Sequence, residues 1–170
     1  RKFQNRYPSN LPLLQLSISG YIHMEHINRY LDHISRPFAP IAVWLLRLGL
    51  GVAFFLHGFE KFPLPPEKMA NWFTKLGYAY PEIITSAVAI GEVGAGVGII
   101  LGGLIRGYVG NIITKVSGGA VVVIMVGAFI IAHSNWFFTS RLFMSEQIFL
   151  FILGLFFLIR GNKCERPYSS

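Results

Sequence analysis

The stretch IAVWLLRLGLGVAFFLHGF, residues 41–59, has only two ionisable side chains, Arg47 and His57. A helix of this length rises about 1.5 Å per residue and so approaches the roughly 30 Å thickness of a bilayer's hydrocarbon core. We therefore expect residues 41–59 to span a membrane. A charge near the bilayer centre is costly, so ionisable side chains within a span usually face other helices and mark functional positions. Arg47 and His57 are thus the first candidate functional residues.

Three further apolar stretches are predicted to span the membrane: residues 83–104, 108–132 and 142–159. The composition agrees, because 53% of the 170 residues are hydrophobic and only 14% are charged, which is too apolar for an ordinary soluble domain. The predicted fold class is all-α, an integral membrane four-helix bundle surrounded by a lipid bilayer.

Two shorter segments show the i, i+3, i+4, i+7 spacing of an amphipathic helix. The apolar residues in question are Ile27, Tyr30, Leu31 and Ile34 in one segment, and Met69, Trp72, Phe73 and Leu76 in the other. The first segment predicts a surface helix that Pro37 and Pro40 end. The second predicts a short interfacial helix between the first two spans, forming a lid over the outer end of the bundle.

We divide the chain into an N-terminal extension of residues 1–39, a membrane domain of residues 40–161 and a tail of residues 162–170. Residues 1–23 precede the first methionine, Met24. We interpret them as an alternative start or a docking arm rather than as a cleaved signal peptide, because their apolar run is short and interrupted.

The charge of +7 comes from Lys and Arg residues scattered over termini and loops, which argues against nucleic-acid binding. Four spans place both termini on the same side of the membrane. The basic residues expected on that side are Arg1, Lys2, Arg6, Arg29, Arg36, Arg106, Arg160, Lys163 and Arg166, against Lys61, Lys68, Lys75 and Arg141 on the other. The positive-inside rule therefore predicts cytoplasmic termini.

Glycines recur along the second predicted span. Gly94, Gly98 and Gly102 form two overlapping small-xxx-small steps, and Gly91 with Ala95 forms an adjoining stripe. This pattern is typical of close helix packing in membranes. Space for a flat ligand is the alternative interpretation.

Arg47 and Glu92 are expected at similar depths, because each lies well inside its span. A guanidinium and a carboxylate cost far less in the membrane as a pair than alone. We predict that they pair, either to fix helix register or with Glu92 handling protons or contacting a quinone. Lys61, on the same face of the first span as Arg47 and His57, is expected to snorkel to the outer edge.

His57 and His133 end antiparallel spans at the outer side, where Glu146 begins the fourth span. Glu60 lies nearby at the rim. Three interpretations stay open: interfacial hydrogen-bonding residues, a quinone site with a histidine donor and a proton-accepting carboxylate, or a metal or bis-histidine haem site. Haem is the weaker cofactor hypothesis, because neither histidine has a second ligand at close spacing. Cys164 is the only cysteine, which excludes a CxxC pair and a multi-cysteine metal site.

Four segments resemble the DoxX/DoxD family of small four-helix membrane proteins: RLGLGVAFFLHGFEKF (47–62), GEVGAGVGIILGGLIRG (91–107), GAFIIAH (127–133) and EQIFLFILGLFFL (146–158). The last helix of the family often ends in a Gly-Pro-Gly-like turn, which Arg160, Gly161 and Asn162 replace here. The resemblance implies a bacterial or archaeal cytoplasmic membrane and association with membrane-linked redox chemistry.

The leading hypothesis is a subunit of a quinone-dependent oxidoreductase that binds a quinone near His57, Glu92, His133, Arg47 and Glu146, with another membrane protein subunit supplying the electron carrier. The alternative is a non-catalytic accessory or assembly subunit of a larger membrane complex. A small transporter or proton path is less favoured, because the chain shows no inverted repeat.

Overall fold

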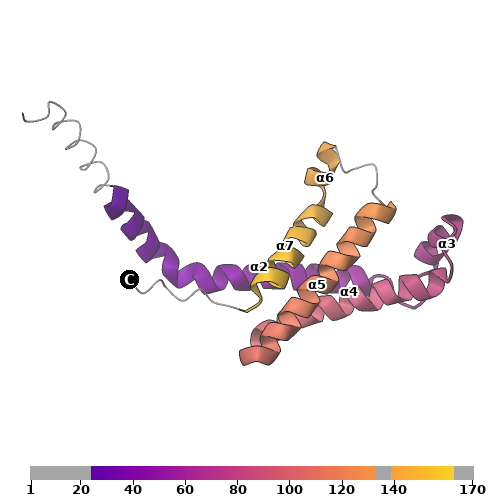
Figure 1. The fold of residues 1–170 in the computed structure, drawn as a ribbon, viewed down its shortest axis with the longest axis horizontal. Helices are drawn as coiled ribbons and strands as arrows, with labels where there is room; N and C mark the ends of the chain where they lie inside the picture. Colours follow the sequence, from indigo (N-terminus) through magenta and orange to yellow (C-terminus); the bar gives the residue numbers. More distant parts are fainter. Residues whose placement is uncertain (1–23, 133–138, 163–170) are drawn as a thin grey trace, which may run out of the picture. The chain divides into compact units, whose positions relative to one another are not determined.

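The computed structural model describes residues 24–132 and 139–162, and every regular element within these ranges is a helix (Figure 1). Residues 24–35 are helical, and the elements that follow them are a 3₁₀ turn, η1, and six helices. Their bounds are η1 Arg36–Phe38, α2 Ala39–Phe59, α3 Glu67–Lys75, α4 Pro81–Leu104, α5 Gly107–Ala132, α6 Ser140–Met144 and α7 Glu146–Arg160. The described chain divides into two compact units on either side of the Val43–Trp44 peptide bond.

In the first unit, residues 24–35 are helical and exposed, as their amphipathic pattern predicts. The prediction that Pro37 and Pro40 end this helix is wrong. The chain tightens into η1 at Pro37 and then continues as α2, so that Met24–Phe59 forms one helical stretch. Proline is tolerated here because it lies at the first positions of each helical segment, where its missing N–H costs no bond.

In the described ranges, three helical stretches are long and apolar enough to cross a membrane: Met24–Phe59, Pro81–Leu104 and Gly107–Ala132. They contain the first three predicted spans. The fourth predicted span, residues 142–159, is instead divided between α6 and α7. Ser145 has an extended backbone, with φ −93° and ψ 149°, and its hydroxyl donates to the carbonyl oxygen of Leu142 at 2.7 Å, so the helix begins again at Glu146.

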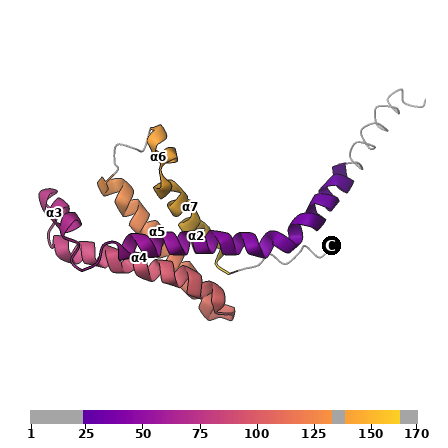
Figure 2. The ribbon, with the colours of Figure 1, turned by 180° about the vertical axis from the view of Figure 1, so that it is seen from behind.

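The helices of the second unit pack through glycines. Gly51 of α2 lies against Gly96 of α4, where a Cβ on Gly96 would come within 2.5 Å of the Gly51 carbonyl oxygen. Gly118 of α5 lies against Gly154 of α7 in the same way. Figures 1 and 2 show α5 and α7 side by side. Small residues permit this approach, which dispersion forces then stabilise in lipid.

The second unit exposes many large apolar side chains and buries several polar ones. Exposed side chains recur every seven residues on α4 and α5: Ile83, Ile90, Val97 and Leu104, and Val116, Val123 and Ile130. The buried polar and charged side chains of the unit are Arg47, Thr85, Glu92, Thr114 and Ser117. This distribution is the one expected of helices that contact lipid outside and one another inside. The chain is therefore a multi-pass membrane protein with a helical bundle.

The predicted interfacial helix is confirmed as α3, which packs against α4. It begins after Pro66 and ends before Gly77, whose φ of 81° is the left-handed conformation that glycine adopts at little cost. Phe73 is buried on the inner face of α3 and contacts the ring of Tyr78, with centroids 5.1 Å apart.

Candidate functional site

The helix register places Glu92 beside the C-terminal end of α2. Gly58 of α2 lies against Ala89 and Val93 of α4, so the first two turns of α4 extend beyond the last turn of α2. The similar depths that we expected for Arg47 and Glu92 assumed that the end of the first span lies level with the start of the second. Glu92 consequently lies next to the residues that follow His57, and not next to Arg47.

The buried Glu92 carboxylate forms an ion pair with Lys61. Glu92 is only 5% exposed, and its Oε2 accepts a hydrogen bond from the Lys61 ammonium. The ammonium also donates to the carbonyl oxygen of His57 at 3.1 Å. Lys61 therefore does not snorkel outward as we expected. It turns inward, closes the end of α2 and neutralises the carboxylate.

The structure brings His57 and Glu146 together. His57 Nε2 lies 3.5 Å from Glu146 Oε1, which joins the end of α2 to the start of α7. Both side chains are partly open, with 43% and 65% of their surfaces exposed. The pair can therefore form hydrogen bonds with a molecule that approaches this end of the bundle, and can transfer a proton to or from it.

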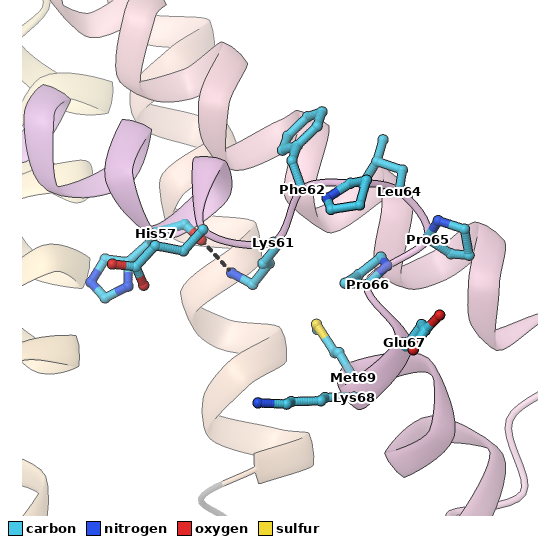
Figure 3. A pocket seen from close by; sticks show the side chains of 11 residues that line it. His57, Lys61, Phe62, Leu64, Pro65, Pro66, Glu67, Lys68 and Met69 are labelled. Carbon is cyan, nitrogen blue, oxygen red and sulfur yellow. Dashed lines mark hydrogen bonds between the residues drawn. The ribbon is translucent and has the colours of Figure 1, made fainter.

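A cavity of about 710 Å³ opens between the end of α2 and the start of α3. Figure 3 shows the side chains of Lys61, Lys68 and Met69 pointing into the space that His57 borders. The complete lining is His57, Glu60, Lys61, Phe62, Pro63, Leu64, Pro65, Pro66, Glu67, Lys68 and Met69. The wall thus combines an apolar chain segment with two ammonium groups, an imidazole and two carboxylates.

The prolines restrict the conformation of this wall. Pro63, Pro65 and Pro66 lie within four consecutive positions, and each ring fixes its own φ near −65°. A segment with few accessible conformations loses little entropy when a ligand orders it. The cavity wall is therefore suited to binding a small molecule without large rearrangement.

The predicted pairing of Arg47 with Glu92 is wrong. Arg47 is 3% exposed and donates to the Ile99 carbonyl oxygen, to Thr114 Oγ1 at 3.1 Å and to Asn162 Oδ1 at 2.8 Å. Its guanidinium also stacks over Phe157, 4.7 Å from the ring centroid. Since Ile99 is seven residues beyond Glu92, this network lies about 10 Å further along α4. Arg47 belongs to the opposite end of the bundle from the cavity.

His57, Glu92 and Glu146 are therefore the predicted site residues that the structure gathers near the cavity. His133 lies outside the described residues, so its place in the site and the bis-histidine haem hypothesis stay predictions. Glu60 is exposed and also lines the cavity. Lys68 was missed as a candidate, and Lys61 was assigned only to the interface. The spacing of His57 and Lys61, four residues apart on one helix face, was the available signal for Lys61.

The fold and this site define a small multi-pass membrane protein whose bundle has buried ionisable groups. Comparison with protein-family models matches DoxX over residues 42–134. The match covers more than half of the chain, and the protein belongs to the DoxX family. The matched region includes both residues of the Lys61–Glu92 pair and ends before α6 and α7. Comparisons with curated proteins and with solved structures found no match.

Proposed function

We propose that the protein is a small subunit of a quinone-dependent redox system and that it binds a quinone in the cavity between α2 and α3. The observation that carries this proposal is the cavity's lining, which joins His57 and Lys61 to an apolar wall. Its volume of about 710 Å³ is within the range of roughly 300–1,000 Å³ typical of small-molecule sites. DoxX proteins are often linked to redox or quinone-related systems, which agrees with this assignment.

The donor set fits a quinone ring. Its carbonyl oxygens accept hydrogen bonds, and the imidazole of His57 and the ammonium of Lys61 both supply donors. Phe62, Leu64 and Met69 provide the apolar surface that a ring and its isoprenoid tail require. A bound quinone would supply reversible two-electron chemistry, with electrons from a partner subunit.

The protein's own contribution would be binding and proton transfer. His57 lies beside the exposed Glu146, and an imidazole and a carboxylate can both accept and release protons, so this pair can carry a proton between the cavity rim and solvent. Glu92 lies behind Lys61 and pairs with its ammonium. Arg47 is left out of the proposed site because its hydrogen bonds are made at the other end of the bundle.

The experiment is quinone extraction from protein purified in mild detergent. We expect stoichiometric quinone with the wild-type chain and about tenfold less after His57→Ala, since losing one hydrogen bond to the ring costs about 1.4 kcal/mol. His33→Ala, on the exposed helix of the first unit, is the matched control and should retain the quinone.

A quinone-free wild-type preparation that co-purifies with a larger membrane complex would contradict this proposal. If His57→Ala and Glu92→Gln then left that complex intact, an accessory or assembly role would explain the protein better. A Soret absorption band lost with His57 would instead indicate haem.

The membrane proposed for the chain is the bacterial or archaeal cytoplasmic membrane, with both termini in the cytoplasm. The distribution of Lys and Arg supports this orientation. In this arrangement the cavity opens at the outer surface, so a quinone dissolved in the bilayer reaches it through the outer leaflet.

A further inference from the structure

Lys61 belongs both to the cavity wall and to the core of the bundle. It lies two residues after the end of α2 and lines the cavity together with His57 and Met69. Its ammonium also reaches Glu92, which is 5% exposed on α4. A molecule in the cavity therefore meets an ammonium that is held from behind by a buried carboxylate.

The hydrogen bonds of Lys61 leave one donor for a ligand. An ammonium carries three N–H donors and no acceptor. The structure directs one donor to Glu92 and one to the carbonyl oxygen of His57. The third donor is bound to neither acceptor, and it belongs to a side chain that is 24% exposed and lines the cavity (Figure 3).

The hydrogen bonds to Glu92 and to the His57 carbonyl oxygen favour binding of a ligand by this third donor. A free lysine side chain loses up to about 2 kcal/mol of rotamer entropy when a ligand orders it. Lys61 has already lost that freedom, because Glu92 and the end of α2 hold its ammonium in place. A bond from an ionised donor is also roughly twice as strong as a neutral one.

We propose that Lys61 is the residue that recognises the carbonyl oxygen of the ring, and that Glu92 acts through Lys61 as its positioning residue. This inference rests on the proposed quinone site and adds a specificity determinant to it. Lys61 selects rings that carry a hydrogen-bond acceptor. A ring of the same shape without oxygen would leave the ammonium's third donor unpaired, which disfavours its binding.

The test compares two probes, 2-methyl-1,4-naphthoquinone and 2-methylnaphthalene, binding to the full chain in detergent. Tryptophan fluorescence quenching measures each dissociation constant, and infrared spectroscopy measures the carbonyl stretch of the bound quinone. The wild-type chain should prefer the quinone. Its carbonyl stretch should be lower than in an apolar solvent, because a charged donor weakens the C=O bond.

Lys61→Met alone would bury an unpaired carboxylate and risk unfolding, so the decisive variant is Lys61→Met with Glu92→Met. Removing both charges avoids that penalty and should leave the thermal unfolding temperature near the wild-type value. We expect the double variant to bind the quinone roughly 10- to 100-fold more weakly and to lose its preference over 2-methylnaphthalene. Lys75→Met, which removes the exposed lysine at the end of α3, is the matched control and should change neither value.

Glu92→Gln tests the positioning role. The amide keeps the shape of the side chain but cannot hold the ammonium by charge. We expect weaker quinone binding and a carbonyl stretch displaced towards the value in apolar solvent. A purely structural role for Glu92 would leave that stretch unchanged.

The measurements distinguish failure of the proposed quinone function from failure of the proposed role of Lys61. If the wild-type chain binds neither probe, the proposed quinone function fails. If it binds the quinone and the double variant binds it equally well, with the same carbonyl stretch, the quinone site stands and the role of Lys61 is overturned.

Discussion

The side chain of Asn162 connects three helices at the end of the bundle that contains Arg47. Its oxygen accepts hydrogen bonds from Arg47 of α2 and Thr114 of α5, both at 2.8 Å. Its amide nitrogen donates to the carbonyl oxygen of Gly102 on α4. The turn after α7 thus supplies an acceptor that the buried guanidinium needs, and it holds the end of α7 against the other helices.

We predict that Asn162→Ala destabilises the bundle by about 1–3 kcal/mol, the cost of leaving buried polar groups short of partners. Arg47 and Thr114 would lose an acceptor and Gly102 a donor. Thermal unfolding in detergent measures the effect. Asn71→Ala, at an exposed position of α3, is the matched control and should lie within about 0.5 kcal/mol of the wild type.

Equal unfolding temperatures for the two asparagine variants would show that the Asn162 network contributes nothing to stability. Arg47→Lys extends the same test. A single ammonium cannot reproduce the planar fork that reaches Ile99, Thr114 and Asn162, so we expect it to destabilise as well.

At the scale of the helices, close backbone approach decides which faces meet. Gly58 and Gly51, seven residues apart on α2, lie against Ala89 and Gly96, which are seven apart on α4. Gly94 lies on the same helix α4, yet a Cβ built there would meet no atom within 4 Å. Gly96 therefore lies at a helix contact, whereas Gly94 of the same helix lies on an open face.

We predict that Gly96→Ala destabilises the bundle by roughly 1–3 kcal/mol, the usual cost of overpacking. The added methyl would lie 2.5 Å from the Gly51 carbonyl oxygen and 2.6 Å from the Phe55 backbone nitrogen, and neither backbone atom can rotate away. Gly94→Ala is the control and should be neutral or slightly stabilising, because alanine favours the helix. Thermal unfolding of both variants in the same detergent makes the comparison. Equal unfolding temperatures for Gly96→Ala and Gly94→Ala would exclude the Gly51–Gly96 contact.

The helices could be predicted from the sequence because length and apolar content are local properties. The starts of α4 and α5 and the end of α2 lie within two residues of the predicted spans. The break at Ser145 could not be predicted, because serine is common within membrane helices. Only the backbone conformation of Ser145 and its hydroxyl contact reveal that a new helix begins at Glu146. The glycine pattern on α4 was recognised, but Gly96, which contacts α2, was not among the glycines chosen.

Part of the site could also be predicted, because residue spacing along a single helix is a local property. A spacing of four residues places His57 and Lys61 on one helical face at the end of α2, and the sequence places Glu146 at the beginning of the fourth predicted span. It does not give the relative height of two helices. The extension of α4 beyond α2 moves Glu92 from Arg47 to Lys61, and this register depends on tertiary contacts such as that of Gly58 with Ala89.

Across the second unit, the two buried charges lie at different levels. Glu92 lies behind Lys61, which lines the cavity, whereas Arg47 lies about 10 Å further along α4, where the chain's last described turn closes over it. The cavity end also carries His57, Glu146 and α3. A ligand arriving from one side of the membrane would therefore meet the Lys61–Glu92 pair and not Arg47. The orientation of the chain then decides from which side that ligand comes.

Cysteine labelling tests this orientation, because Cys164 is the chain's only cysteine. With cytoplasmic termini, a membrane-impermeant maleimide should label wild-type Cys164 in inverted vesicles and leave it unlabelled in intact cells. In a Cys164→Ser background, Lys68→Cys at the cavity should show the reverse pattern. Arg106→Cys, in the turn between α4 and α5, is the matched control and should behave like Cys164.

The labelling pattern also tests whether the second helix crosses the bilayer. If α4 spans the membrane, positions 68 and 106 must lie on opposite sides, whatever the orientation of the chain. Labelling of both from the same side would therefore contradict a membrane-spanning α4. Labelling of position 68 only from the cytoplasmic side, with position 106 only from the outer side, would keep the span but invert the topology. The cavity and its Lys61–Glu92 pair would then face cytoplasmic partners.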